Sequence, residues 1–227
     1  MDFDFSDDQE QLRDAVRKYV DKGYTFERRR ATEKAGGFDR AAYNELAELG
    51  LTGLYVPEDD GGMGMGPVEG MVVMEELGRG IVLEPLAQAL IAGAVISGYG
   101  DAATKAAWLP GIASGEKLVV LAYQERAARY KLDVCEAKAT QAPGGYVINA
   151  TKTVVSVGDK ADAFIVPAKV NSQLALFIVE RNSAGVTTSG YGTQEGGRAA
   201  DVVLKNAPAT LLTMDGQTAL EHAVDIG

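Results

Sequence analysis

The sequence predicts an α+β protein, a helical domain followed by an antiparallel β-domain, and three observations lead to this prediction. Apolar residues recur at helical spacing up to residue 115. Beyond it, short runs rich in valine, isoleucine, threonine and phenylalanine are separated by turn residues. Helical spacing returns after residue 213. We therefore expect an N-terminal α-helical domain over residues 1–115, a middle β-domain over 116–213 and the first turns of a C-terminal helical domain over 214–227.

Five helices are expected in the first part, each with a recognisable start. The first follows Ser6, and Gln9, three residues later, completes a capping box. The other four begin at Asp39, Pro67, Pro85 and Asp101. The last should end at Leu109, because Pro110 has no backbone N–H to donate. The helix from Pro67 is expected to bury four side chains: Val68, Met71, Val72 and Met74.

Two features of this part have both a structural and a ligand-binding interpretation. Three arginines, Arg28 to Arg30, could contact phosphate or an acidic partner, but we favour a solvated, salt-bridged face. The glycine-rich segment Val56–Gly66 precedes a helix, where backbone amides can cradle phosphate. No GKS or GKT follows it, no clear strand precedes it, and it contains acidic residues, so we favour a plain turn.

The β-domain is expected to contain eight short strands. Their candidate ranges are 118–124, 133–140, 145–149, 152–157, 163–169, 174–180, 186–190 and 199–205. The intervening turns are rich in glycine, proline, asparagine and aspartate. So many short strands in one domain predict a small antiparallel barrel or sandwich.

Composition excludes several classes of function. Thirty-two acidic residues against 22 basic ones give a formal net charge of -10, which argues against nucleic acid as the main partner. One cysteine and one histidine rule out an intrachain disulfide and a cysteine- or histidine-cluster metal site. This usage suits a reducing, cytoplasmic setting. The acidic N-terminus lacks the pattern of a signal peptide, and the uncharged run Pro85–Gly100 is too short to span a membrane.

The candidate site lies where two apolar runs end in polar residues. Leu118–Ala122 is followed by Tyr123 and Gln124, and Val154–Val155 is followed by Ser156. A buried strand can hold a polar group at the mouth of an apolar pocket. We expect these two strand ends to face one flat cofactor.

Several segments resemble markers of the acyl-CoA dehydrogenase family. They are LGLTGLYVPEDDGGMG (49–64), EELGRG (75–80), WLPGIASGEK (108–117), LFIVERNSAGV (176–186) and GRAADVVLKN (197–206). Together they cover nearly the whole chain in the family's order. The start, MDFDFSDDQ, and the segment AYQERAARYKLDV (122–134) are similar to the small-subunit type of pimeloyl-CoA dehydrogenase-like two-subunit enzymes. The resemblance implies a barrel for the β-domain, FAD as cofactor and an acyl-CoA thioester as substrate.

The resemblance also implies roles for individual residues. Tyr123 and Gln124 stand where the family contacts the flavin, with Gln124 in place of a threonine, and Ser156 keeps a hydroxyl that lies near the flavin N5. Arg129 and Tyr130 replace a glycine and a serine that admit the substrate, so they either block the pocket or clamp a phosphate. The tryptophan that stacks on the flavin is replaced by Val154.

No catalytic residue is expected in this chain. The family's base, which removes the α-proton while the β-hydrogen leaves as hydride, is a glutamate of the C-terminal helical domain. We expect the chain to be truncated at the start of that domain, and a lone copy to be inactive. The expected partner is the large subunit of a two-subunit enzyme, in a heterotetramer, with a homo-oligomer as the other possibility.

Two alternatives remain open. One is a degenerate, non-catalytic subunit that builds the interface of a heteromeric acyl-CoA dehydrogenase, which the changes at Arg129, Tyr130 and Val154 favour. The other is a binding module for a different apolar ligand. The identity of the acyl chain is open in every case.

Overall fold

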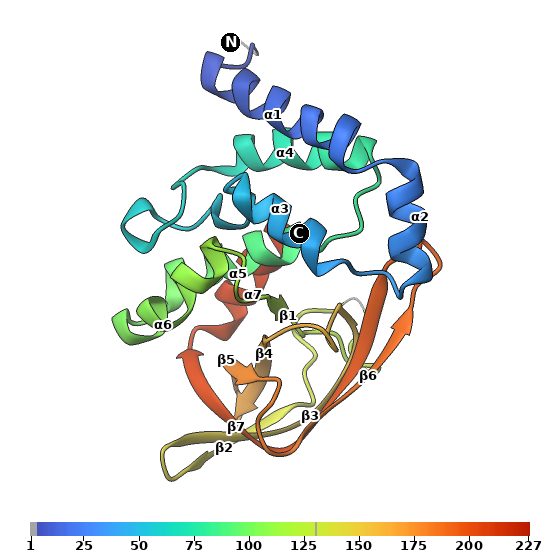
Figure 1. The fold of residues 1–227 in the computed structure, drawn as a ribbon. Helices are drawn as coiled ribbons and strands as arrows, with labels where there is room; N and C mark the ends of the chain where they lie inside the picture. The colour runs from blue at the N-terminus through green and yellow to red at the C-terminus, as the bar shows by residue number, and fades with distance from the viewer. Residues whose placement is uncertain (1–3, 130) are drawn as a thin grey trace.

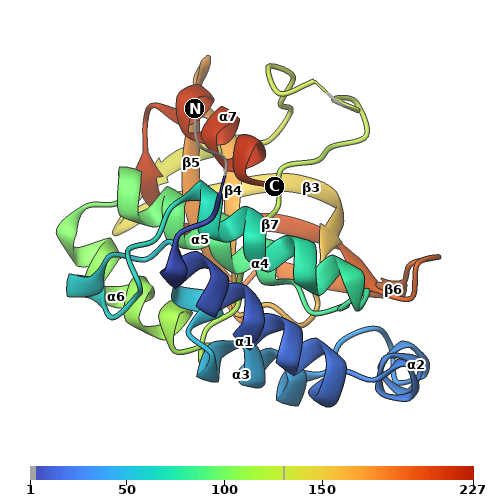
Figure 2. The ribbon, with the colours of Figure 1, turned by 90° about the horizontal axis from the view of Figure 1, so that it is seen from above.

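The computed structural model describes residues 4–129 and 131–227 (Figure 1). A layer of helices comes first in the chain: α1 (Asp7–Gly23), α2 (Phe26–Lys34), α3 (Arg40–Glu48), α4 (Pro67–Arg79), α5 (Leu86–Tyr99) and α6 (Ala102–Ala113). Two short 3-10 turns, Leu51–Gly53 and Glu58–Asp60, lie between α3 and α4. Helices α1 and α4 pack side by side at the outer edge of this layer (Figure 2). The predicted helical part is thereby confirmed.

The strands follow the helices: β1 (Val119–Leu121), β2 (Lys138–Ala142), β3 (Gly145–Ser156), β4 (Ala163–Val170), β5 (Gln173–Glu180), β6 (Val186–Gly192) and β7 (Arg198–Thr213). Pairing runs from β4 through β2, β3, β7 and β5 and returns to β4, so the sheet closes into a barrel. Helix α7 (Gly216–Ile226) comes last. The α+β architecture with a barrel is confirmed, although the barrel is not wholly antiparallel, because β1 and β2 both run parallel to β4.

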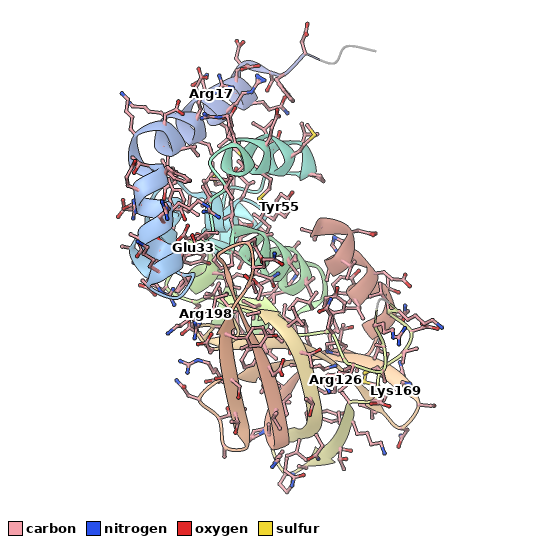
Figure 3. The ribbon with its side chains drawn as sticks, turned by 90° about the vertical axis from the view of Figure 1, so that its right-hand side faces the viewer. Arg17, Glu33, Tyr55, Arg126, Lys169 and Arg198 are labelled. Carbon is pink, nitrogen blue, oxygen red and sulfur yellow. The ribbon has the colours of Figure 1, made fainter. Side chains whose placement is uncertain are left out.

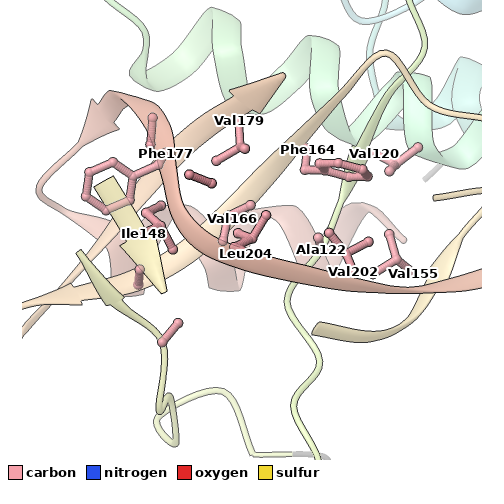
Figure 4. Close-up of a cluster of buried hydrophobic side chains, with 14 of the residues drawn as sticks. Val120, Ala122, Ile148, Val155, Phe164, Val166, Phe177, Val179, Val202 and Leu204 are labelled. Carbon is pink, nitrogen blue, oxygen red and sulfur yellow. The ribbon is translucent and has the colours of Figure 1, made fainter. Parts of the chain in front are cut away.

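Alternate residues of β1, β4 and β5 face two different cores. One set, with Val120 and Phe164, fills the barrel interior together with Phe177 and Val202 (Figure 4). The other set, with Val119, packs against α5, α6 and α7. Strand β1 is therefore buried on both faces, which explains why its sequence is a continuous apolar run.

The strand count differs from the prediction. The ranges 145–149 and 152–157, predicted as two strands, form the single strand β3. The strand continues through two irregularities in its pairing with β7: between Ile148 and Ala150 the extra residue is in β7, and between Lys152 and Val155 it is in β3. The last strand is also longer than predicted, since β7 pairs first with β6 and then with β5 along the same edge.

Two helix predictions are corrected. Helix α2 was not predicted as a separate helix, and the Thr25 side chain caps it by accepting from the Arg28 N–H. Helix α6 does not end before Pro110 but continues to Ala113. A proline close to a C-terminus removes only one ladder hydrogen bond, and the Ser114 N–H still donates to the Pro110 carbonyl.

The buried face of α4 is also different from the predicted one. Val68, Met71 and Met74 are exposed, whereas Val72 and Val73 are buried. The helix packs on α1 and α5 through Val73 and Leu77, which places three of the four predicted residues on the outer surface and leaves Val72 buried as predicted.

The arginine segment holds α2 in place. Arg28 pairs with Asp39 and Glu45, and Arg29 donates to the Glu195 carbonyl. The turn between β6 and β7 therefore rests on α2: Gly196 lies against Glu33, and Arg198, labelled with Glu33 in Figure 3, donates to the Gly36 carbonyl. The salt-bridged interpretation is confirmed for Arg28 and Arg29, which are partly buried rather than fully solvated.

The glycine-rich segment is a turn whose amides are already used. The N–H groups of residues 60–65 donate to backbone carbonyls of residues 53–58, and the Gly66 N–H donates to the Glu69 side chain. None of these seven amides is left to receive a phosphate.

Candidate cofactor site

The polar end of β1 is held between a helix and β3. The Gln88 side chain of α5 accepts from the Leu121 N–H at 2.9 Å. Beyond the strand, the Thr153 N–H of β3 donates to the Gln124 carbonyl at 2.9 Å. The Gln124 amide in turn donates to the Tyr123 hydroxyl at 3.3 Å. Both side chains are partly exposed, so their polar groups are accessible at a fixed position.

The part of β3 that meets Gln124 is a bulge. Lys152 pairs with Val202 and Val155 pairs with Ala200, so Thr153 and Val154 together face the single residue Asp201. Val154 has a φ of 54° and is 57% exposed. A positive φ is a genuine outlier for a β-branched residue, and such strain is concentrated at functional sites. The bulge therefore presents strained backbone to solvent next to Gln124.

A buried ion pair lies behind these two strand ends. The Lys152 Nζ is 2.6 Å from the Glu125 Oε1, and both side chains are buried. The ammonium also donates to the Pro167 carbonyl at 2.8 Å and to the Tyr123 carbonyl at 3.5 Å. The Glu125 carboxylate accepts from the N–H groups of Glu136 and Ala137.

The protonation of Glu125 follows from these contacts. Burial opposes ionisation, but the Lys152 ammonium and the two backbone amides outweigh it, so the pKa of Glu125 lies below its ordinary value. The Cys135 thiol beside it has a raised pKa, chiefly because it is buried. The site is thus a neutral pair of opposite charges with a protonated thiol at its edge.

The segment after Glu125 carries the residues predicted to contact substrate. Arg126 and Arg129 are exposed, and Arg129 has a φ of 52°. The amides of Ala128 and Arg129 both donate to the Glu125 carbonyl, which fixes the turn. Tyr130 lies outside the described residues.

Charged side chains of both signs line the mouth of this region. Arg126 shares a hollow of about 380 Å³ with Lys205 of β7 and with Thr151 and Thr153 of β3. Arg126 and Lys169 lie on the same side of the barrel (Figure 3). The exposed Glu136 lines the same hollow, so its carboxylate lies beside the cations of Arg126 and Lys205.

Two of the predicted site residues contact β3 directly, whereas Ser156 is connected to that contact only along the strand. Tyr123 and Gln124 meet β3 at Thr153. Ser156 is partly buried three residues farther along the same strand, where it pairs with Ala199. Sequence reasoning missed Glu125 and Lys152. The only signal was a lysine between two threonines in a strand pattern, and this does not reveal burial.

Across residues 4–129 and 131–227, no three histidine, cysteine, aspartate or glutamate side chains gather as metal ligands would. In the same part of the chain, the helices are too short or too polar to cross a bilayer.

The chain is similar to characterised proteins over both parts. Residues 6–116 match the family described as "Acyl-CoA dehydrogenase, N-terminal domain". Benzylmalonyl-CoA dehydrogenase from Aromatoleum aromaticum is 31% identical over 192 residues, which are 82% of this chain and 51% of that protein. The chain spans about half the length of the curated relatives that it matches.

Solved structures extend the similarity through the barrel. The ChsE4-ChsE5 complex from Mycobacterium tuberculosis has a TM-score of 0.87 and 27% identity, and the match covers 100% of this chain and 61% of that chain. An acyl-CoA dehydrogenase complexed with FAD from Bacillus anthracis has a TM-score of 0.86 and 26% identity, and covers 99% of this chain and 41% of that one.

Proposed function

Because the chain belongs to the acyl-CoA dehydrogenase family, we propose that it is part of an FAD-dependent subunit that dehydrogenates an acyl-CoA thioester at its α,β-bond. One observation carries this proposal. The end of β1 and the bulge of β3, which the sequence marked as two separate polar ends, are joined by the hydrogen bond from Thr153 to Gln124.

The groups at this junction fit a flavin. The edge of an isoalloxazine ring alternates hydrogen-bond donors and acceptors, and the Gln124 amide can do both. Tyr123 and Ser156 add hydroxyl groups, and the exposed backbone of Val154 leaves the ladder at the same place. In this proposal Tyr123, Gln124 and Ser156 hold the flavin, which when bound supplies the acceptor for the hydride. A solved relative with the same fold is described as complexed with FAD.

Two further residues are proposed to contact the acyl-CoA. The exposed Arg129 guanidinium can bind a phosphate of coenzyme A through paired N–H donors. Tyr130 is its neighbour in the chain. Arg126 and Lys205, which line a hollow together with Glu136, offer two further cations to the same anionic ligand.

The proposed division of labour leaves proton removal to another segment. We assign the helical domain to residues 1–115, the barrel domain to 116–213 and the start of a further helical domain to 214–227. No residue of these three parts is assigned as the base, and this chain alone is proposed not to turn over. Its own residues would position the flavin and hold the thioester, whose oxygen must be hydrogen-bonded for the α-proton to leave.

The proposed partner is the large subunit of a pimeloyl-CoA dehydrogenase-like enzyme, in a heterotetramer. Solved relatives that are complexes of two different proteins support a two-subunit assembly. The low cysteine content fits a reducing compartment, and the proposal includes a cytoplasmic location.

A second candidate is a non-catalytic subunit that builds the interface of such an enzyme. It is favoured by the bulky Arg129 and by Val154, which offers no aromatic ring to stack on a flavin.

Flavin uptake separates the two candidates. The gene product would be purified alone and with its co-encoded large subunit, mixed with FAD, freed of unbound FAD by gel filtration and examined by visible absorption. We expect the complex to retain a flavin band that Gln124→Leu in this chain weakens. A complex that stays colourless contradicts flavin binding and leaves the interface role. A band that Gln124→Leu does not change assigns the flavin to the partner.

A further inference from the structure

Two charged side chains at the end of the barrel have no part in the contacts described for the proposed cofactor. Lys152 is fully buried and Glu125 is 5% exposed. Charged side chains are rarely buried to this degree unless they are paired. The contacts of these two side chains therefore indicate the role of the ion pair.

The pair connects four segments of the chain at one point. Lys152 belongs to β3, and its ammonium contacts the Tyr123 carbonyl after β1 and the Pro167 carbonyl of β4. Glu125 accepts from the amides of Glu136 and Ala137, which lead into β2. Buried ion pairs are weak stabilisers compared with apolar residues of the same volume, but a buried polar group can fix a register.

Register matters here because Lys152 is the residue immediately before the bulge. A slip of one residue in a strand turns every side chain to the opposite face. If β3 slipped by one residue against its neighbours β2 and β7, the ammonium would leave its three acceptors, and Ser156 would turn to the other face of the sheet. The ion pair thus opposes a movement that would separate the Gln124 end of β1 from the bulge.

We propose that Glu125 and Lys152 are positioning residues for the flavin: by fixing β3 to the segment that follows β1, they hold Gln124 and residues 153–156 in the arrangement that the isoalloxazine ring meets. This inference rests on the proposed function. It assigns the pair no contact with the flavin and no step in the reaction.

The test compares two pairs of substitutions in the full chain, assembled with the large subunit. In Glu125→Gln/Lys152→Met both buried charges are removed together, so that no unpaired charge remains. The matched control is Glu76→Gln/Arg17→Met, which removes an ion pair with a buried carboxylate from the α1–α4 contact, away from the barrel. FAD is titrated into each protein by flavin fluorescence, after circular dichroism has confirmed that the protein is folded.

We expect the barrel variant to bind FAD at least about tenfold more weakly than the unchanged protein, the effect of losing one or two well-placed hydrogen bonds. The control should bind as the unchanged protein does. If the double variant does not fold, Glu125→Gln alone keeps the side-chain shape and can accept from only one of the two backbone N–H groups, and it should still weaken binding.

Amide hydrogen exchange provides a readout that does not depend on flavin. In the protein without FAD, the barrel variant should exchange the amides of Thr153, Glu136 and Ala137 faster, while β5 amides keep their protection. Equal FAD affinity together with unchanged exchange would overturn the inference and leave the proposed function standing. An unchanged protein that takes up no FAD would overturn the proposed function, and the inference with it.

Discussion

The barrel end and the helical layer each contain a buried glutamate with a basic partner, and the two pairs are built differently. In the helical layer, Glu76 is buried, but its partners Arg17 and Arg79 are 47% and 45% exposed. At the barrel end, Lys152 and Glu125 are both buried, and backbone groups of three other segments complete their hydrogen bonds.

The difference shows what each pair is suited to do. An arginine at the surface keeps its charge in water, so the Glu76 cluster joins α1 to α4 at small cost and tolerates movement. A fully buried pair is costly to form and sensitive to geometry, so it fixes one arrangement. The strained Val154, two residues after Lys152, fits this account, because strain persists only where the surroundings over-determine the backbone.

The largest effect should come from breaking the barrel pair on one side. Lys152→Met leaves the Glu125 carboxylate buried without its counterion, which should lower the free energy of unfolding by about 3–5 kcal/mol. Denaturant unfolding followed by circular dichroism measures this. A loss no larger than that of Glu76→Gln would mean that the two pairs do not differ as described.

The next effect should come from relieving the strain in the bulge. Val154→Gly removes the side chain that disfavours a φ of 54°, and should raise the free energy of unfolding by about 1 kcal/mol. The matched change Val155→Gly, at a buried position one residue later, should lower it. Thermal unfolding of both variants tests this, and a destabilising Val154→Gly would show that the bulge is not strained.

A pH dependence should separate the two regions. Burial raises the pKa of Glu84 in the helical layer, so its ionisation costs stability above the ordinary glutamate pKa of about 4.3. Glu84→Gln should therefore stabilise the protein near neutral pH and give no gain below that value.

For Glu125 the sign is opposite. Its pKa is lowered in the folded protein, so its contribution is present above the ordinary glutamate value and is lost as the pH falls through the lowered one. Unfolding measured across the acid range checks both residues. A Glu84→Gln protein that gains equally at all pH values would contradict the burial of that charge.

The smallest effect is expected at the exposed side of the helical cluster. Glu76→Gln keeps the side-chain shape while weakening contacts to arginines that water already solvates, and should lower the free energy of unfolding by about 1 kcal/mol. Added salt should reduce the difference between the two proteins. A salt-independent loss of several kcal/mol would make this pair resemble the barrel pair.

Local chemistry made much of the fold predictable from the sequence. The capping box of Ser6 and Gln9 forms as expected, because caps depend on residues three apart. The apolar run of β1 gave the buried strand and its polar end. Helix α6 was predicted to end too early. The effect of Pro110 on the helix depends on how close the proline lies to the helix end, and here only three residues follow it.

Features that depend on pairing could not be predicted. The bulge at Thr153 and Val154 exists only because β7 offers one residue against two, and the sequence of β3 alone does not contain that count. The burial of Lys152 depends on a carboxylate 27 positions earlier in the chain. Likewise, α4 contains more apolar residues than one face of the helix can bury, so Met71 is exposed.

The central claim, that the end of β1 and the bulge of β3 form one surface for the flavin, is tested most directly by amide hydrogen exchange with and without FAD in the assembled enzyme. We expect slower exchange on FAD addition at the Val154–Ser156 amides and at Gln124, with no change in β5. Protection confined to other segments, with the bulge amides exchanging at the same rate in both states, would contradict it.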